Sequence, residues 1–146
     1  MIKKVGIIGG AGKMGSSFKN AFENLSLDVI ISDKESNNQL RLILDTCDWI
    51  ILCVPIDKTL SVFNEIKSEI KPYQVFSDFT SVKSILSKET KNCDFEFISC
   101  HPLFGPLNNF TGQNIIIIPI STKNKYKEVK KILGLLDLKI TEMKSF

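Results

Sequence analysis

Short runs of apolar, mostly β-branched residues alternate along the chain with longer segments whose apolar residues recur every three or four positions. The short runs are almost continuously apolar, which is typical of strands covered on both faces of a parallel sheet. The longer segments have the spacing of amphipathic helices, as in the stripe formed by Phe18, Ala21, Phe22 and Leu25. This alternation predicts βαβ units and an α/β fold with a parallel sheet.

The same pattern gives the expected bounds of each element. Strands are expected at Lys3–Ile8, Asp28–Ser32, Trp49–Val54, Gln74–Ser77, Glu96–Cys100, Asn114–Pro119 and Leu138–Thr141. Helices are expected at Lys13–Asn24, Thr59–Lys71 and Lys125–Leu136, with a short one at Leu40–Thr46. No repeat, low-complexity tract or linker interrupts the pattern, so residues 1–146 are expected to form one domain.

Charge and hydropathy narrow the function classes. The net charge of +3 comes from scattered lysines, and no basic cluster interleaved with aromatic residues indicates nucleic-acid binding. No apolar run is long enough to cross a bilayer, and the N-terminus lacks a signal-peptide pattern. We therefore expect a cytoplasmic protein that binds neither nucleic acid nor membranes.

The cysteines indicate neither a metal site nor a disulfide framework. They show no CxxC pairing and no regular spacing. We expect free thiols in a reducing compartment and no bound metal. The residues concerned are Cys47, Cys53, Cys93 and Cys100.

The strongest local motif is a glycine-rich turn at residues 9–15, between a predicted strand and a predicted helix. Gly10, Gly12 and Gly15 fit the pattern G-x-G-x-x-G, and Asp33 follows the second predicted strand. This context predicts a dinucleotide-binding turn. In such a turn Gly10 allows the bend, Gly12 lets the backbone approach the pyrophosphate, and Gly15 allows close packing of the helix. An ordinary glycine turn beside a surface aspartate is the alternative.

The turn favours NAD as the cofactor. The start of the helix, with the N–H groups of Lys13 and Met14, would hold the phosphates. Asp33 would accept hydrogen bonds from the ribose and repel a 2′-phosphate, so NADP is less favoured, although Lys34 could tolerate that phosphate. A Walker P-loop is excluded because neither Ser nor Thr follows Lys13.

Three further segments follow predicted strands, where open α/β sheets bind their ligands. Residues 54–56 follow the third strand, residues 78–83 the fourth and residues 101–106 the fifth. Because the carboxyl ends of parallel strands share one edge, these segments are expected to meet in one cleft. The candidate residues there are Val54, Pro55, Thr80, Ser81 and His101.

His101 is the only histidine, and histidine is the side chain that ordinarily titrates near neutral pH. It is a candidate catalytic residue, with a structural role as the alternative. Ser81 could be a functional hydroxyl, the cap of a following helix, or both. Cys100 adjoins His101, but neighbours in a strand point to opposite faces, which argues against a Cys–His nucleophilic pair.

The sequence resembles the nucleotide-binding domain of prephenate dehydrogenases, including the dehydrogenase part of bifunctional chorismate mutase/prephenate dehydrogenases. The resemblance covers essentially the whole chain and rests on four segments in order: G-G-A-G-K-M-G at 9–15, V-P-I at 54–56, D-F-T-S-V-K at 78–83 and H-P-L-F-G-P at 101–106. The last two are the more specific. The resemblance implies a Rossmann-type doubly wound fold. It also implies NAD-dependent oxidative decarboxylation of prephenate or arogenate in tyrosine biosynthesis.

The resemblance also implies roles for two residues. His101 matches the histidine that takes the proton of the substrate's 4-hydroxyl while hydride leaves the same carbon. Ser81 matches a serine that orients this histidine and the hydroxyl. The choice between prephenate and arogenate is left open, because it depends on contacts outside this domain.

Family members continue into a helical domain that dimerises and supplies an arginine for a substrate carboxylate. This sequence ends about where that domain would begin, and its only arginine, Arg41, is not a convincing substitute. We therefore expect the C-terminal helical domain to be absent, turnover by the isolated chain to be poor, and a helical partner chain or a homodimer to complete the site. The alternatives are an NAD-binding regulatory module without turnover and a small dehydrogenase or reductase for another substrate.

Overall fold

The computed structural model describes residues 1–33, 37–79, 86 and 93–144. The strands are β1 Lys4–Ile8, β2 Asp28–Ser32, β3 Trp49–Leu52, β4 Val75–Asp78, β5 Glu96–Pro102, β6 Asn114–Ser121 and β7 Lys139–Glu142. The helices are α1 Lys13–Asn24, α2 Asn37–Thr46, α3 Ile56–Ile66 and α5 Tyr126–Leu135. A short 3₁₀ turn, η1 Lys67–Glu69, follows α3.

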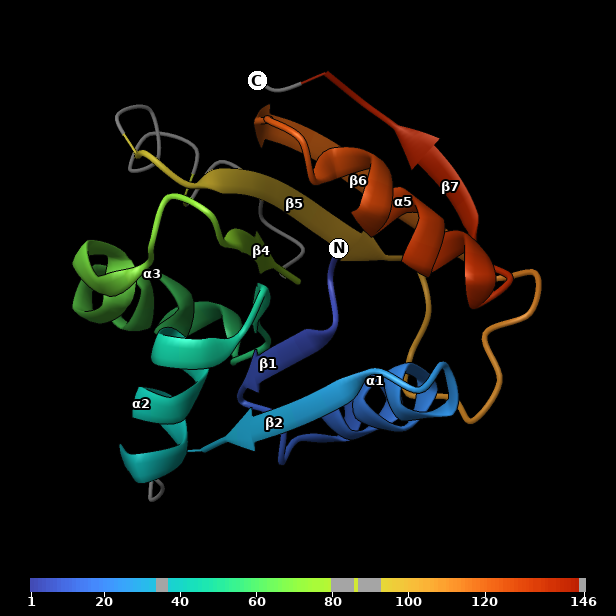
Figure 1. Cartoon of the computed structure of the whole chain (residues 1–146). Coiled ribbons are helices and arrows are strands. Elements are labelled where there is room, and N and C mark those ends of the chain that lie inside the picture. Colours follow the sequence, from blue (N-terminus) through green and yellow to red (C-terminus); the bar gives the residue numbers. More distant parts are fainter. Residues whose placement is uncertain (34–36, 80–85, 87–92, 145–146) are drawn as a thin grey trace.

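The strands form one sheet in the order β2-β1-β3-β4-β5-β6-β7 (Figure 1). Strands β1 to β5 run parallel, whereas β6 is antiparallel to β5 and parallel to β7. The antiparallel pairing of β5 and β6 follows from the segment that joins them. Residues 103–113 contain no helix, whereas two consecutive parallel strands need a long crossover connection. The chain goes from β1 to β2 on one side and returns to β3 on the other, so a crevice lies at the carboxyl ends of β1 and β3.

Helices cover both faces of the sheet (Figure 1). On one face α1 and α5 bury a cluster that includes Phe18, Phe22 and Val129. On the other face α2 and α3 bury a cluster that includes Ile43 and Phe63. The nearly continuous apolar strands predicted a sheet covered on both sides, and the structure confirms that prediction.

The predicted α/β architecture with a mostly parallel sheet is also confirmed. The bounds of α1 and β2 agree with the prediction, and most other bounds differ by a few residues. The largest difference is α3, which begins at Ile56 rather than Thr59 and ends at Ile66. The reason is Pro55, which has no N–H to extend the pairing of β3 and is the N-cap of the helix, with Asp57 favourably placed in the first turn.

One buried polar contact joins two neighbouring strands of the core. The indole Nε1 of Trp49 on β3 donates to Oγ of Ser77 on β4 at 2.9 Å, and both side chains are fully buried. A buried donor without an acceptor is costly. Ser77 therefore makes it possible to place a tryptophan at the centre of the sheet.

Candidate functional site

The glycine-rich turn between β1 and α1 is fastened to the end of β2. The N–H groups of Gly9 and Gly10 both donate to the carbonyl oxygen of Ser32, at 2.7 and 3.3 Å. Gly9 has a φ of +87°, in the left-handed region that glycine adopts readily. The bend that the motif suggested at Gly10 therefore lies at Gly9. This turn brings the start of α1 against the carboxyl ends of β1 and β2.

The three glycines of the motif have different surroundings. A Cβ atom at Gly10 would lie 2.6 Å from Cγ2 of Ile31, and one at Gly15 would lie 2.7 Å from the Cα atom of Gly10. At Gly12 the nearest atom would be the carbonyl oxygen of Gly9 at 3.5 Å, an ordinary contact. Gly10 and Gly15 therefore serve the internal packing of the turn, whereas Gly12 is exposed and can face a ligand.

The N-terminus of α1 has the properties of an anion-binding site. Gly12 is the N-cap and provides no capping side chain, and the first turn contains no acidic residue. The first N–H groups of an α-helix have no intrahelical acceptor, and a partial positive charge gathers there. A phosphate group would satisfy both features.

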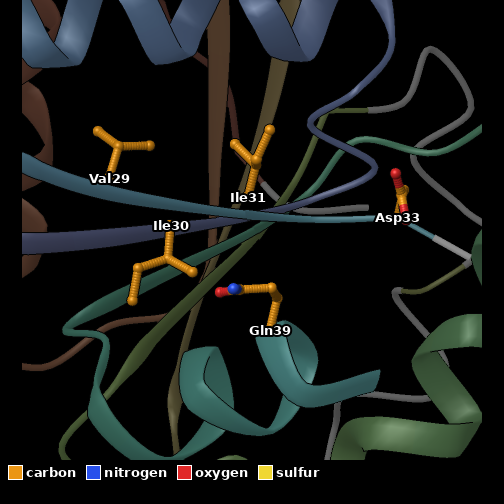
Figure 2. Close-up of a pocket in the computed structure, with 5 residues that line it drawn as sticks. All are labelled: Val29, Ile30, Ile31, Asp33 and Gln39. Carbon is orange, nitrogen blue, oxygen red and sulfur yellow. The ribbon is translucent and has the colours of Figure 1, made fainter. Parts of the chain in front are cut away.

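A cavity of about 480 Å³ opens beside the glycine turn. Its floor is formed by the ends of β1, β2 and β3, and its walls by α2 and α3. Asp33 lies just beyond β2 and contributes to the lining. The same residue borders a shallower hollow of about 390 Å³ along β2, where Gln39 of α2 reaches toward the strand (Figure 2). Asp33 is thus exposed at the junction of two recesses.

The structure brings four of the sequence-predicted cofactor residues to the cavity beside the glycine turn, namely Gly12, Asp33, Val54 and Pro55. Lys13 instead lines a neighbouring hollow of about 490 Å³ between α1 and residues 106–108. Met14 is half-buried and packs against the core of the α1 face. Gly10 and Gly15 are buried within the turn. Only some of the motif residues therefore line the cavity, and the others shape the turn.

His101 is the penultimate residue of β5, and its side chain is half-buried. Because β5 runs parallel to β4, His101 lies toward the carboxyl edge of the sheet, the edge that carries the glycine turn. The neighbouring Cys100 is fully buried in the cluster under α1 and α5. Alternation along the strand directs the two side chains to opposite faces.

Thr80, Ser81 and Lys34 lie outside the described residues. The chain leaves β4 through Asp78, which is buried, and Phe79, whose ring packs edge-on against Phe18 at a centroid distance of 4.8 Å. The last described residue before the two hydroxyl residues, Phe79, thus lies just past the carboxyl end of β4.

Sequence reasoning missed the helical walls of the cavity. Leu40 of α2 lines one wall, and Lys58, Ser61, Val62 and Glu65 of α3 line the other. The α3 residues recur every three or four positions and therefore share one helix face. A signal was available, since a helix that begins directly after Val54-Pro55 must flank the crevice with its first turns.

The described ranges contain no group of three or more His, Cys, Asp or Glu side chains that could hold a metal ion. None of the cysteines there forms a disulfide. Burial raises the pKa of the Cys53 thiol to about 11, so this cavity residue is a poor nucleophile at neutral pH. No helix in the described part of the chain is long and apolar enough to span a bilayer.

Comparison with known proteins gives one family. Residues 4–142 match the model of the prephenate dehydrogenase nucleotide-binding domain. The T-protein of Haemophilus influenzae is 31% identical over 105 residues, which are 71% of this chain and 28% of the T-protein. A Methanocaldococcus jannaschii protein named "Probable arogenate/prephenate dehydrogenase" is 27% identical, over 85% of this chain and 32% of that protein. The chain spans less than a third of the length of these two relatives.

Solved structures share the fold. The arogenate dehydrogenase of Synechocystis has a TM-score of 0.80 at 20% identity, covering 97% of this chain and 59% of that one. The prephenate dehydrogenase of A. aeolicus, solved with hydroxyphenyl propionate and NAD⁺, has a TM-score of 0.75 at 20% identity, covering 99% of this chain and 60% of that one. The glycine turn and its crevice are those of a nucleotide-binding fold, and the family match covers residues 4–142. The chain therefore belongs to the prephenate dehydrogenase family and corresponds to the nucleotide-binding domain of that family.

Proposed function

We propose that this chain is the cofactor-binding and catalytic half of an NAD-dependent prephenate or arogenate dehydrogenase of tyrosine biosynthesis. The observation that carries the proposal is the family match over residues 4–142 together with His101 at the edge of the sheet that bears the nucleotide cavity. Ligands of open α/β sheets bind at this edge.

The residues of the cavity fit a dinucleotide. Gly12 and the N-terminus of α1 suit the pyrophosphate, because the backbone there is exposed and no side chain caps it. Asp33 suits the adenosine ribose, because a carboxylate accepts hydrogen bonds from both hydroxyls. The same charge disfavours a 2′-phosphate, so we propose NAD rather than NADP. When bound, the nicotinamide ring of NAD⁺ supplies the hydride acceptor.

His101 is the proposed general base. It would take the proton of the substrate's ring hydroxyl while hydride leaves the carbon that bears this hydroxyl. The C–C bond to the ring carboxylate then breaks, carbon dioxide leaves, and the bonding electron pair completes the aromatic ring. Ser81 is the proposed positioning residue for the imidazole and the hydroxyl. A well-placed general base contributes about 10²–10⁴-fold to the rate.

We propose that residues of another protein segment bind the substrate carboxylate. Arg41 is a poor candidate, because its Nη2 donates to both carboxylate oxygens of Glu69 at 2.7 and 2.8 Å and its Nη1 lies 3.5 Å from Asp45. An arginine that donates two parallel hydrogen bonds to a carboxylate both fixes its orientation and compensates its charge. We propose that a helical domain, a helical partner chain or a second copy provides that contact.

Two measurements test the function. The first is NADH binding to the chain, followed by nicotinamide fluorescence, where we expect micromolar or weaker affinity because the proposed helical partner would have to close the cleft over the cofactor. The second is NADH formation from prephenate or arogenate with and without a helical partner domain. We expect little turnover alone and a clear increase with the partner.

The His101→Asn variant separates catalysis from binding. It should keep the NADH affinity of the parent and lose at least about 100-fold in turnover of the completed enzyme. The parent rate should rise with pH across the neutral range, because a histidine base acts only after it has lost its proton. A flat profile between about pH 5.5 and 8 would argue against a histidine base.

A further inference from the structure

One face of α3 forms a polar wall of the nucleotide cavity. Lys58, Ser61 and Glu65 line it at helical spacing, with Val62 between them. An α-helix rises about 1.5 Å per residue, so the wall extends about 10 Å from Lys58 to Glu65. This length is comparable to that of an adenosine unit.

The direction of α3 decides which end of the wall meets which part of a dinucleotide. The helix starts directly after Pro55, at the carboxyl end of β3 and beside the glycine turn. It then runs back along the sheet, so Lys58 lies at the end nearest Gly12 and Glu65 at the far end. With a pyrophosphate at Gly12 and a ribose at Asp33, the part of this cavity that remains for the base lies between Leu40 and the far end of α3.

The chemistry of this space suits a purine with an amino group. Leu40 and Val62 are half-buried and offer apolar contacts from opposite walls. In the described part of the chain Glu65 makes no hydrogen bond and no ion pair, whereas Glu69, four residues on, is held by Arg41. An ionised carboxylate only accepts hydrogen bonds. It therefore matches the exocyclic amine of adenine and opposes the carbonyl oxygen that hypoxanthine has at the same ring position.

We infer that Glu65 accepts a hydrogen bond from the exocyclic amine of the cofactor's adenine. This contact makes the site selective for adenine dinucleotides over 6-oxopurine dinucleotides. This inference rests on the proposed binding of NAD in the cavity. It assigns a specificity-determining residue on a helix that the glycine-rich motif does not include.

The test compares NADH with reduced nicotinamide hypoxanthine dinucleotide, which differs only at the base. Dissociation constants are measured by nicotinamide fluorescence for the full chain. The parent should bind NADH about 3- to 10-fold more tightly, the effect of one hydrogen bond at a partly exposed site. In Glu65→Gln the ratio should fall to within about twofold of unity, because an amide can donate to the carbonyl as well as accept from the amine.

Two further variants make the result specific. Asp57→Asn removes a carboxylate from the first turn of the same helix, outside the cavity lining, and should retain the parent ratio. Glu65→Ala should weaken NADH by about 3- to 10-fold and should not weaken the hypoxanthine dinucleotide, because the substitution also removes the carboxylate that opposes its carbonyl oxygen. Both positions are exposed, and thermal unfolding verifies that each variant is folded.

Three results would overturn the inference. A parent that binds both dinucleotides equally has no base selectivity, and a ratio that survives Glu65→Gln assigns the selectivity to another group. In both cases NADH still binds, so the proposed cofactor function stands. A parent that binds neither dinucleotide would overturn the proposed cofactor function and this inference together.

Discussion

The backbone of α1 touches the backbone of the glycine turn at Gly15 and Gly10, where a Cβ atom on Gly15 would lie 2.7 Å from the Cα atom of Gly10. The atoms in the way belong to the main chain and cannot rotate aside as a side chain can. Gly12, three residues before Gly15, has no such restriction. The two glycines can therefore be separated by experiment into one that serves the fold and one that serves the ligand.

We predict that Gly15→Ala lowers the free energy of unfolding by about 1–3 kcal/mol, the usual cost of forcing an extra methyl into a packed site. Gly12→Ala should stay within about 1 kcal/mol of the parent, because its Cβ meets no close atom. It should nevertheless raise the dissociation constant for NADH at least tenfold by blocking the approach of the pyrophosphate. Urea unfolding and nicotinamide fluorescence measure the two effects. Equal stability of Gly15→Ala and the parent would contradict the backbone contact.

Asp33→Ala should loosen the preference for NADH over NADPH. Removal of the carboxylate would end the proposed repulsion of the 2′-phosphate and the proposed hydrogen bonds to the ribose, so the ratio of the two dissociation constants should fall at least about fivefold. Asp28→Ala, at the opposite end of β2 and paired with Lys4 on the surface, is the control and should keep the parent ratio. An unchanged ratio in Asp33→Ala would remove this residue from cofactor choice.

Ser77→Ala should destabilise the protein by about 1–3 kcal/mol, because the indole N–H of Trp49 then remains buried without an acceptor. Trp49 is the only tryptophan, so its emission follows the unfolding transition directly. Ser68→Ala, at an exposed position of η1, should change the free energy of unfolding by less than about 0.5 kcal/mol. Similar small effects of both substitutions would mean that the indole finds another acceptor.

The Cys47 thiol should make stability depend on alkaline pH. Burial raises its pKa from 9.0 to about 12, so the folded state holds the proton more tightly than the unfolded state. The resulting stabilisation is fully present below pH 9 and is lost as the pH rises toward 12. The stability difference between the parent and Cys47→Ala, measured in urea, should therefore be constant up to about pH 8 and shrink above pH 9. A difference that stays constant to about pH 11 would contradict the shift.

Much of the fold could be predicted from local sequence. The bounds of α1 follow from a glycine turn and a stripe that includes Phe18 and Phe22, and those of β2 from an apolar run that ends before Asp33. These signals involve only a few neighbouring residues, so they can be recognised without the tertiary structure. The start of α3 was predicted three residues late, because the apolar spacing outweighed the helix-starting signal of Pro55.

The candidate site could be predicted only in part. Gly12, Asp33, Val54 and Pro55 were found because each follows a strand at the edge where ligands bind. Glu65 could not be found in this way, since nothing in its neighbourhood in sequence distinguishes it from Asp57 on the same helix. Its significance depends on what lies across the cavity.

The sequence by itself determined the alternation of strands and helices, the glycine turn and the family, because these are properties of short segments and their order. Only the tertiary structure decided that Gly9 makes the left-handed bend, that Gly10 must be small because Ile31 lies against it, and that α3 forms a wall of the cavity. The physical reason is that segments distant in sequence contact one another, and enclose a cavity together, only after the sheet has assembled.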